Sequence, residues 1–176
     1  MNINCSIYMN DEKVFCKDGD PYVNAGMWHF ACMLIGGNAG QTLNISNTNI
    51  NTGVRVMAAQ GTIGVSGTGI VVGSGSTAVT ISRYALATQI AHGVGAGQLS
   101  FAAQTYTAPT TDGTKRYWKI TRVFTNTSGG TVTVREVGLY ANFSGAPHML
   151  HMDLTGDIAV ANNQALTVVF EYSSTA

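Results

Sequence analysis

Two histidines and an aspartate near the end of the sequence, His148, His151 and Asp153, are the residues best suited by type to bind a metal ion. The surrounding segment HMLHMDL is predicted to be a strand. Residues three apart on a strand point to opposite faces, so the two imidazoles share a cation only if a bulge realigns them. We therefore interpret both histidines as surface or interface residues, and the sequence predicts no metal site.

The three cysteines, Cys5, Cys16 and Cys32, are odd in number and form no Cys-x-x-Cys pair. This pattern argues against a disulfide framework and favours reduced thiols. His29 and Cys32 have a spacing that places them on one face of a helix, but the set matches no known zinc spacing. Core packing is the preferred explanation, and no cofactor is predicted.

The carboxylates form no visible pair for acid/base chemistry, because they are separated along the chain and lie mostly in predicted turns or strand ends. No serine lies in a G-x-S-x-G elbow. We therefore predict no catalytic residue and no enzymatic function. The carboxylates considered are Asp112, Glu136, Asp153, Asp157 and Glu171.

The glycine-dense stretch GTIGVSGTGIVVGSGST (Gly61 to Thr77) has the glycine content of a phosphate-binding loop. It lacks the G-K-[ST] ending that meets phosphate and metal, and no acidic residue follows about 20 positions on, as a dinucleotide site requires. We interpret it as strands and tight turns where backbones pack closely.

A small cluster of basic and aromatic residues occupies the stretch KRYWKITR, residues 115 to 122. Stacking on single-stranded nucleic acid or on a sugar ring is one interpretation. However, strand alternation splits the cluster over two faces, and a satisfied hairpin is the preferred interpretation. The candidate interaction surface in this cluster consists of Tyr117, Trp118 and Lys119.

The clearest folding signal is the segment from Arg116 to Tyr140, which is predicted to be a β-hairpin with its turn at NTSGG. A five-residue loop, Thr127 to Thr131, places Arg122 opposite Glu136. We expect a structural ion pair that fixes the register, in preference to a catalytic or ligand-binding pair. One face of the first arm is formed by Trp118, Ile120, Arg122 and Phe124.

The fold class predicted from the whole chain is mainly β, with an antiparallel sandwich or jelly-roll-like domain. Glycine accounts for 21 of the 176 residues, and short alternating segments are separated by turn residues. The last strand, Ala165 to Ser173, alternates most clearly. A short helix is predicted from Asn24 to Ile35, with a buried strand as its alternative.

The chain is predicted to divide into an N-terminal segment, residues 1–60, and a β-sandwich domain, residues 61–176. The first segment holds the helix and first strands and is expected to serve attachment or assembly. It begins without the pattern of a secretory signal, and the apolar run from Met27 to Ile35 is too short to span a bilayer.

Charge is sparse in the middle of the chain. The net charge is zero, so no global field attracts nucleic acid or an anionic membrane. Between Asp20 and Asp112 only Arg55 and Arg83 are formally charged. A free monomer normally carries charge over its surface to stay soluble. We therefore expect another subunit to cover part of this region.

Three segments resemble uncharacterised structural proteins of tailed bacteriophages. They are GIVVGSGSTAVTISRYALATQIAHGVGAGQLSF (Gly69 to Phe101), ITRVFTNTSGGTVTVREVGLY (Ile120 to Tyr140) and ANNQALTVVFEYS (161–173). The resemblance consists of strand and turn motifs and carries no catalytic residue. The first 60 residues match it least.

The resemblance implies a virion protein that is assembled in the host cytoplasm. We expect a non-enzymatic structural component that forms a symmetric oligomer in the neck or tail. A capsid decoration protein and a carbohydrate-binding receptor-recognition module are the alternatives. The expected partners are further copies of the chain, other virion proteins and, for the last alternative, a host-surface glycan; neither nucleic acid nor membrane is expected.

Overall fold

The computed structural model describes residues 2–18, 40–52, 58–143 and 145–175, and this part of the chain is mainly β with antiparallel sheets and no helix. The predicted helix from Asn24 to Ile35 lies outside the described residues. None of the described segments is a helix of the length and apolarity that crossing a membrane requires. The strands are β1 (Asn2–Met9), β2 (Glu12–Asp18), β3 (Gly40–Leu43), β4 (Asn49–Thr52), β5 (Gly69–Gly73), β6 (Ser100–Phe101), β7 (Thr105–Asp112), β8 (Lys115–Thr125), β9 (Val132–Phe143), β10 (Ala146–Val160) and β11 (Ala165–Thr175).

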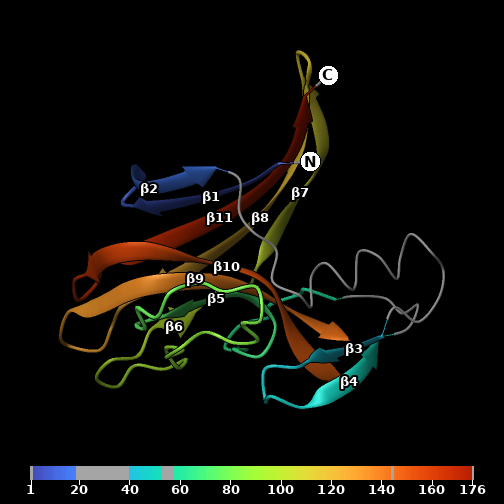
Figure 1. Ribbon diagram of the computed structural model, residues 1–176. Coiled ribbons are helices and arrows are strands. Elements are labelled where there is room, and N and C mark those ends of the chain that lie inside the picture. Colours follow the sequence, from blue (N-terminus) through green and yellow to red (C-terminus); the bar gives the residue numbers. More distant parts are fainter. Residues whose placement is uncertain (1, 19–39, 53–57, 144, 176) are drawn as a thin grey trace.

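Two larger sheets carry most of these strands (Figure 1). Sheet A has the order β2-β1-β11-β8-β6, and β7 also pairs with β8. Sheet B has the order β10-β9-β5, while β3 and β4 form a separate pair. Because β1 pairs with β11, the first strands of the predicted N-terminal segment belong to the same sheet as the last strand. The expected division at residue 60 therefore does not separate the sheets.

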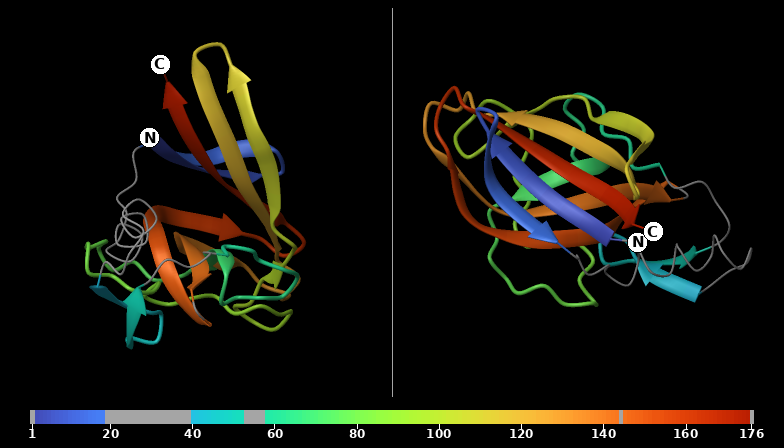
Figure 2. Two further views of the ribbon diagram at one scale, coloured as in Figure 1. Left: turned by 90° about the vertical axis from the view of Figure 1, so that its right-hand side faces the viewer. Right: turned by 90° about the horizontal axis from the view of Figure 1, so that it is seen from above.

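The main hydrophobic core draws residues from both sheets, which lie one above the other in Figure 1. It contains alternate residues of β8 and β11, and the predicted alternation of these two strands is confirmed by their burial. The ends of β7, β8 and β11 project past sheet B (Figure 2). The core residues of β1, β8 and β11 are Ile3, Cys5, Ile7, Ile120, Phe124, Leu166, Val168, Phe170 and Tyr172.

The predicted hairpin from Arg116 to Tyr140 is wrong, because its two arms, β8 and β9, lie in different sheets. Both edges of β8 are occupied by other strands, β11 on one side and β6 and β7 on the other. The turn does reverse the chain, but it carries the chain from sheet A to sheet B. The arms then pack apolar face against apolar face, which buries more surface than edge pairing alone.

β9 does not keep one alternation of buried residues along its whole length. Val132 and Val134 belong to the main core, but farther along the core residues are Val137 and Leu139. The register of β10 against β9 is irregular at the same point. Tyr140 instead joins a second apolar cluster. The phase of the alternation thus shifts beside Glu136, as happens where a strand pair is bulged.

Candidate functional site

Arg122 is fully buried and donates five hydrogen bonds, all of them to backbone carbonyls. Burial lowers the pKa of its guanidinium to about 10, so the group is still charged at neutral pH. The rings of Phe101 and Phe124 lie 5.1 and 5.8 Å from the guanidinium carbon. The carbonyl acceptors are those of Ala102 at 2.9 Å, Thr68 at 3.3 Å, Ile70 at 2.8 Å, Thr62 at 2.8 Å and Val65 at 2.7 Å.

Glu136 is a second buried charged residue that bonds to the loop backbone. Its buried carboxylate accepts hydrogen bonds from the amides of Gly75 at 3.1 Å, Ala87 at 3.0 Å and Thr88 at 2.8 Å. A guanidinium nitrogen of Arg83 lies 3.9 Å from the same carboxylate. A charged acceptor with three amide donors holds the two ends of the intervening loop together.

The predicted ion pair between Arg122 and Glu136 is not formed. The two residues lie on strands of different sheets, and each is occupied by other partners. Arg122 holds the carbonyls of the loop before β5, and Glu136 holds the amides of the loop after β5. We call residues 61–68 and 74–99, which these two charges fasten, the loop surface.

Glycines allow the loops to approach the two charges. A Cβ atom on Gly61 would lie 2.8 Å from the Arg122 guanidinium. One on Gly73 or Gly75 would lie 2.5 or 2.6 Å from the Glu136 carboxylate. These distances are shorter than real side chains tolerate, so no larger residue fits without displacement. Backbones also approach closely here, since a Cβ on Gly69 would lie 2.7 Å from the Cα of Gly61, but the stretch contains one strand, β5, where several were expected.

The loop surface exposes aliphatic side chains and almost no charge. Ile63, Ile81 and Val94 are 75%, 69% and 66% exposed. Arg83 is the only formally charged residue of these loops, and it is turned inward onto backbone carbonyls and Glu136. The loops lie beside β5 and β6 (Figure 1). Exposed apolar side chains on an uncharged surface are typical of protein–protein contact sites.

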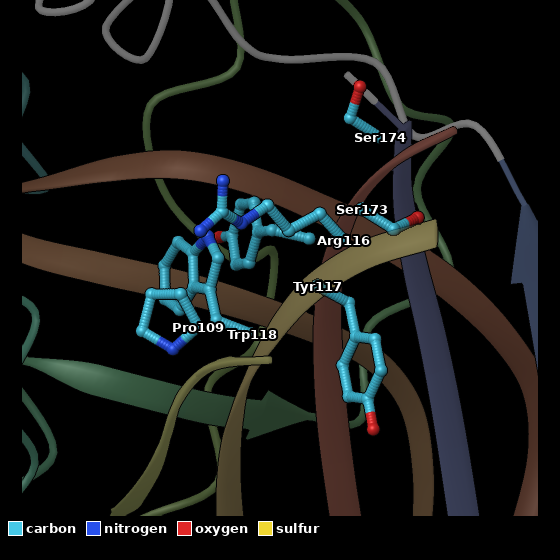
Figure 3. A pocket seen from close by; sticks show the side chains of 7 residues that line it. Pro109, Arg116, Tyr117, Trp118, Ser173 and Ser174 are labelled. Atoms are coloured by element: carbon cyan, nitrogen blue, oxygen red, sulfur yellow. The ribbon is translucent and has the colours of Figure 1, made fainter. Parts of the chain in front are cut away.

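A second feature lies where β7, β8 and β11 project. A hollow of about 200 Å³ is lined, among the described residues, by Pro109, Arg116, Tyr117, Trp118, Tyr172, Ser173 and Ser174 (Figure 3). The rings of Trp118 and Tyr172 stack with centroids 4.2 Å apart and an angle of 6°. We call this feature the aromatic hollow.

The candidate interaction surface of Tyr117, Trp118 and Lys119 is divided between the two faces of sheet A. Trp118 faces the core side and contributes to the aromatic hollow, whereas Tyr117 points away from it (Figure 3). Lys119 lies above the Tyr117 ring, 5.1 Å from its centroid, and pairs with Glu171. Tyr117 also lines the hollow, but its ring is directed away, so only the Trp118 ring of the three stacks on a residue of β11.

The sequence did not indicate most residues of these two sites. For the exposed side chains of Ile63, Ile81 and Val94, the only indication in the sequence was the scarcity of charged residues around them. Pro109 and Tyr172 reach the aromatic hollow through strand pairing between distant segments, which the sequence does not reveal. Arg116 was noted only as part of the basic cluster.

The prediction that His148 and His151 are surface or interface residues is wrong within the chain itself, because both are buried. The register shift between Met149 and His151 supplies the bulge considered from the sequence. Even so, the described residues contain no group of three His, Cys, Asp or Glu side chains placed to hold a metal ion. His151 Nε2 lies 2.7 Å from the hydroxyl of Tyr172, and Asp153 pairs with Lys17.

Acid is expected to destabilise the fold through His151. Burial lowers its pKa from 6.5 to about 4, with the charge of Asp153 opposing that shift. Between these values the unfolded chain binds more protons, so stability falls as the pH drops from about 6.5 to about 4, by up to about 3 kcal/mol. Burial also lowers the pKa of His148.

Urea unfolding across this pH range measures the effect. His151→Gln, which takes up no proton here, is expected to flatten the pH dependence. Tyr172→Phe removes the bonded hydroxyl but leaves the imidazole buried, so it should keep the slope. Equal slopes for the wild type and His151→Gln would contradict the assignment.

Cys5 is buried and Cys16 is exposed. His29 and Cys32 lie outside the described residues. Of the remaining carboxylates, Asp157 pairs with Arg135 at 2.7 Å, and Glu171 pairs with Lys115 and Lys119.

The chain matches no protein-family model, and no curated protein or solved structure shows significant similarity to it.

Proposed function

We propose that the protein is a non-enzymatic structural component of a tailed-phage virion, which assembles through the loop surface into a symmetric oligomer in the neck or tail. The observation that carries the proposal is the exposure of Ile63, Ile81 and Val94 on loops whose only formal charge is turned inward. Contact between two such surfaces buries apolar side chains and separates no charge from water. A further copy of the chain is a suitable occupant for that reason.

The fastening of the loops supports the same proposal. A loop that must be ordered on binding loses part of its binding free energy to that ordering. Arg122 and Glu136 bond the loop backbones inside the subunit before any partner arrives. Two charged residues are thus used to fix the shape of a surface that has almost no charge of its own.

The proposal includes the arrangement of the two sheets in the domain. Two antiparallel sheets that share one core are consistent with a β-sandwich, and we assign the described strands to a jelly-roll-like sandwich. The loop surface consists of connections that lie outside the paired strands. Neighbouring subunits of a ring can then contact one another without opening either sheet.

Light scattering over a concentration series tests the proposal. The wild type is expected to form a defined oligomer, and Ile63→Asp combined with Ile81→Asp and Val94→Asp should reduce it to a monomer. Val14→Asp on β2, where the side chain is 42% exposed, is the matched control and should leave the oligomer intact. A wild type that stays monomeric at high concentration and binds no other virion protein would overturn the proposal.

The aromatic hollow favours a second function, recognition of a host-surface glycan. Stacked aromatic rings at a hollow beside the Arg116 guanidinium provide both an apolar wall and hydrogen-bond donors for a sugar. This function is compatible with assembly, because the hollow and the loop surface involve different residues.

A further inference from the structure

Arg116 differs from the other arginines that the structure describes. Arg83, Arg122 and Arg135 each bond a carbonyl or a carboxylate. Arg116 is exposed and has no hydrogen bond or ion pair with any described residue. Its side chain extends toward Trp118 and Pro109 at the aromatic hollow (Figure 3). The hollow therefore carries one unpaired positive charge.

A bulge in β7 shapes the wall of the hollow. Thr107 pairs with Lys119 and Thr110 with Tyr117, so Ala108 and Pro109 together oppose the single residue Trp118. Proline has no backbone N–H to lose from the ladder and is accepted at such a place. Bulges redirect side chains next to binding sites, and this one brings Pro109 to the hollow.

The floor of the hollow is fixed from beneath. The Tyr172 hydroxyl is bonded to the buried His151, so the ring of Tyr172 is held against Trp118. Ser174 lies directly across from Arg116 in the strand pairing and lines the hollow, but its hydroxyl points away from the rings (Figure 3). The site thus combines a rigid apolar wall with one guanidinium.

We propose that the aromatic hollow binds a saccharide ring that carries a carboxylate, as in a uronic acid. The apolar wall of Trp118 and Pro109 contacts the C–H groups of the ring, and Arg116 receives the carboxylate through paired N–H groups. The volume of about 200 Å³ is below that of most ligand pockets and suits a single ring. A single unpaired cation matches one carboxylate better than the repeated phosphates of a nucleic acid. The inference rests on the glycan-recognition function proposed above.

Binding of tetragalacturonate and of its fully methyl-esterified form tests the inference, because the two differ in charge and share the same rings. The probe is the fluorescence of Trp118 in a Trp28→Phe background, which leaves one tryptophan in the sequence. Tetragalacturonate is expected to bind at least about tenfold more tightly than the ester. Arg116→Gln should abolish that preference. Lys119→Gln, the same loss of charge on the other face of β8, should keep it.

The possible outcomes separate the two levels of the proposal. Equal binding of the acid and the ester, unchanged by Arg116→Gln, overturns the inference and leaves glycan recognition standing. If neither tetragalacturonate nor its ester binds, both the inference of a carboxylate-bearing saccharide and the proposed glycan recognition are overturned. Acetate that competes as well as tetragalacturonate would show a simple anion site and overturn the saccharide assignment. Circular dichroism of each variant verifies that the fold is retained.

Discussion

Arg122→Met is expected to lower the free energy of unfolding by about 3–5 kcal/mol. Methionine replaces the volume of the side chain, but the five carbonyls bonded to the guanidinium lose their donor inside the protein. Replacing a buried ion pair by apolar residues can be harmless when both partners are changed. Here the partners are backbone groups and cannot be changed with it.

Two further variants make this prediction specific. Arg122→Lys keeps the charge but offers at most three donors without the planar fork, so an intermediate loss of about 2 kcal/mol is expected. Arg116→Met makes the same change at an exposed arginine and should alter stability by less than about 0.5 kcal/mol. Chemical denaturation followed by circular dichroism gives all three values. A loss below about 1 kcal/mol for Arg122→Met would show that the carbonyls do not depend on it.

Glu136→Leu is expected to cost about 3–5 kcal/mol, because three buried or partly buried amides lose a charged acceptor. Glu136→Gln should cost about 2 kcal/mol. It keeps one oxygen for the Thr88 and Gly75 amides, but its NH2 group then faces the amide of Ala87. Native-state hydrogen exchange distinguishes the loss of these loop contacts from general destabilisation. Relative to the wild type, exchange should accelerate more at the amides of Ala87 and Thr88 than at those of β11.

The control for Glu136 is Glu171→Gln, which changes a carboxylate on the outer face of sheet A that is paired with lysines. Surface ion pairs contribute little, so its stability should change by less than about 1 kcal/mol. If the exchange of Ala87 and Thr88 were unchanged in Glu136→Gln, the fastening of this loop by Glu136 would be refuted.

The parts of the fold that depend on local alternation were predictable. In β8 and β11 every second residue enters one core, and the sequence shows this directly. The partner of each strand was not predictable, because the turn after β8 has the same composition whether the chain forms a hairpin or crosses to another sheet. In β9 the set of residues that enters the core changes beside Glu136, where the pairing with β10 is irregular, and local alternation does not reveal such a shift.

The two buried charges that fasten the loop surface make contacts that span long stretches of chain. Arg122 reaches the carbonyl of Thr62, and Glu136 reaches the amide of Gly75. A charge in an apolar strand indicates a buried polar contact, but its partners were backbone groups, which leave no trace in residue types. The scarcity of charge between Asp20 and Asp112 was the one sequence signal that pointed to the loop surface.

Hydrogen–deuterium exchange of the assembled protein, compared with the monomeric variant carrying aspartates at Ile63, Ile81 and Val94, tests the central proposal most directly. If the loop surface is the subunit interface, assembly should slow the exchange of residues 61–68 and 74–99 and leave the edge strands β2 and β7 unchanged. Slowed exchange confined to β2 or β7, with the loops unaffected, would contradict it.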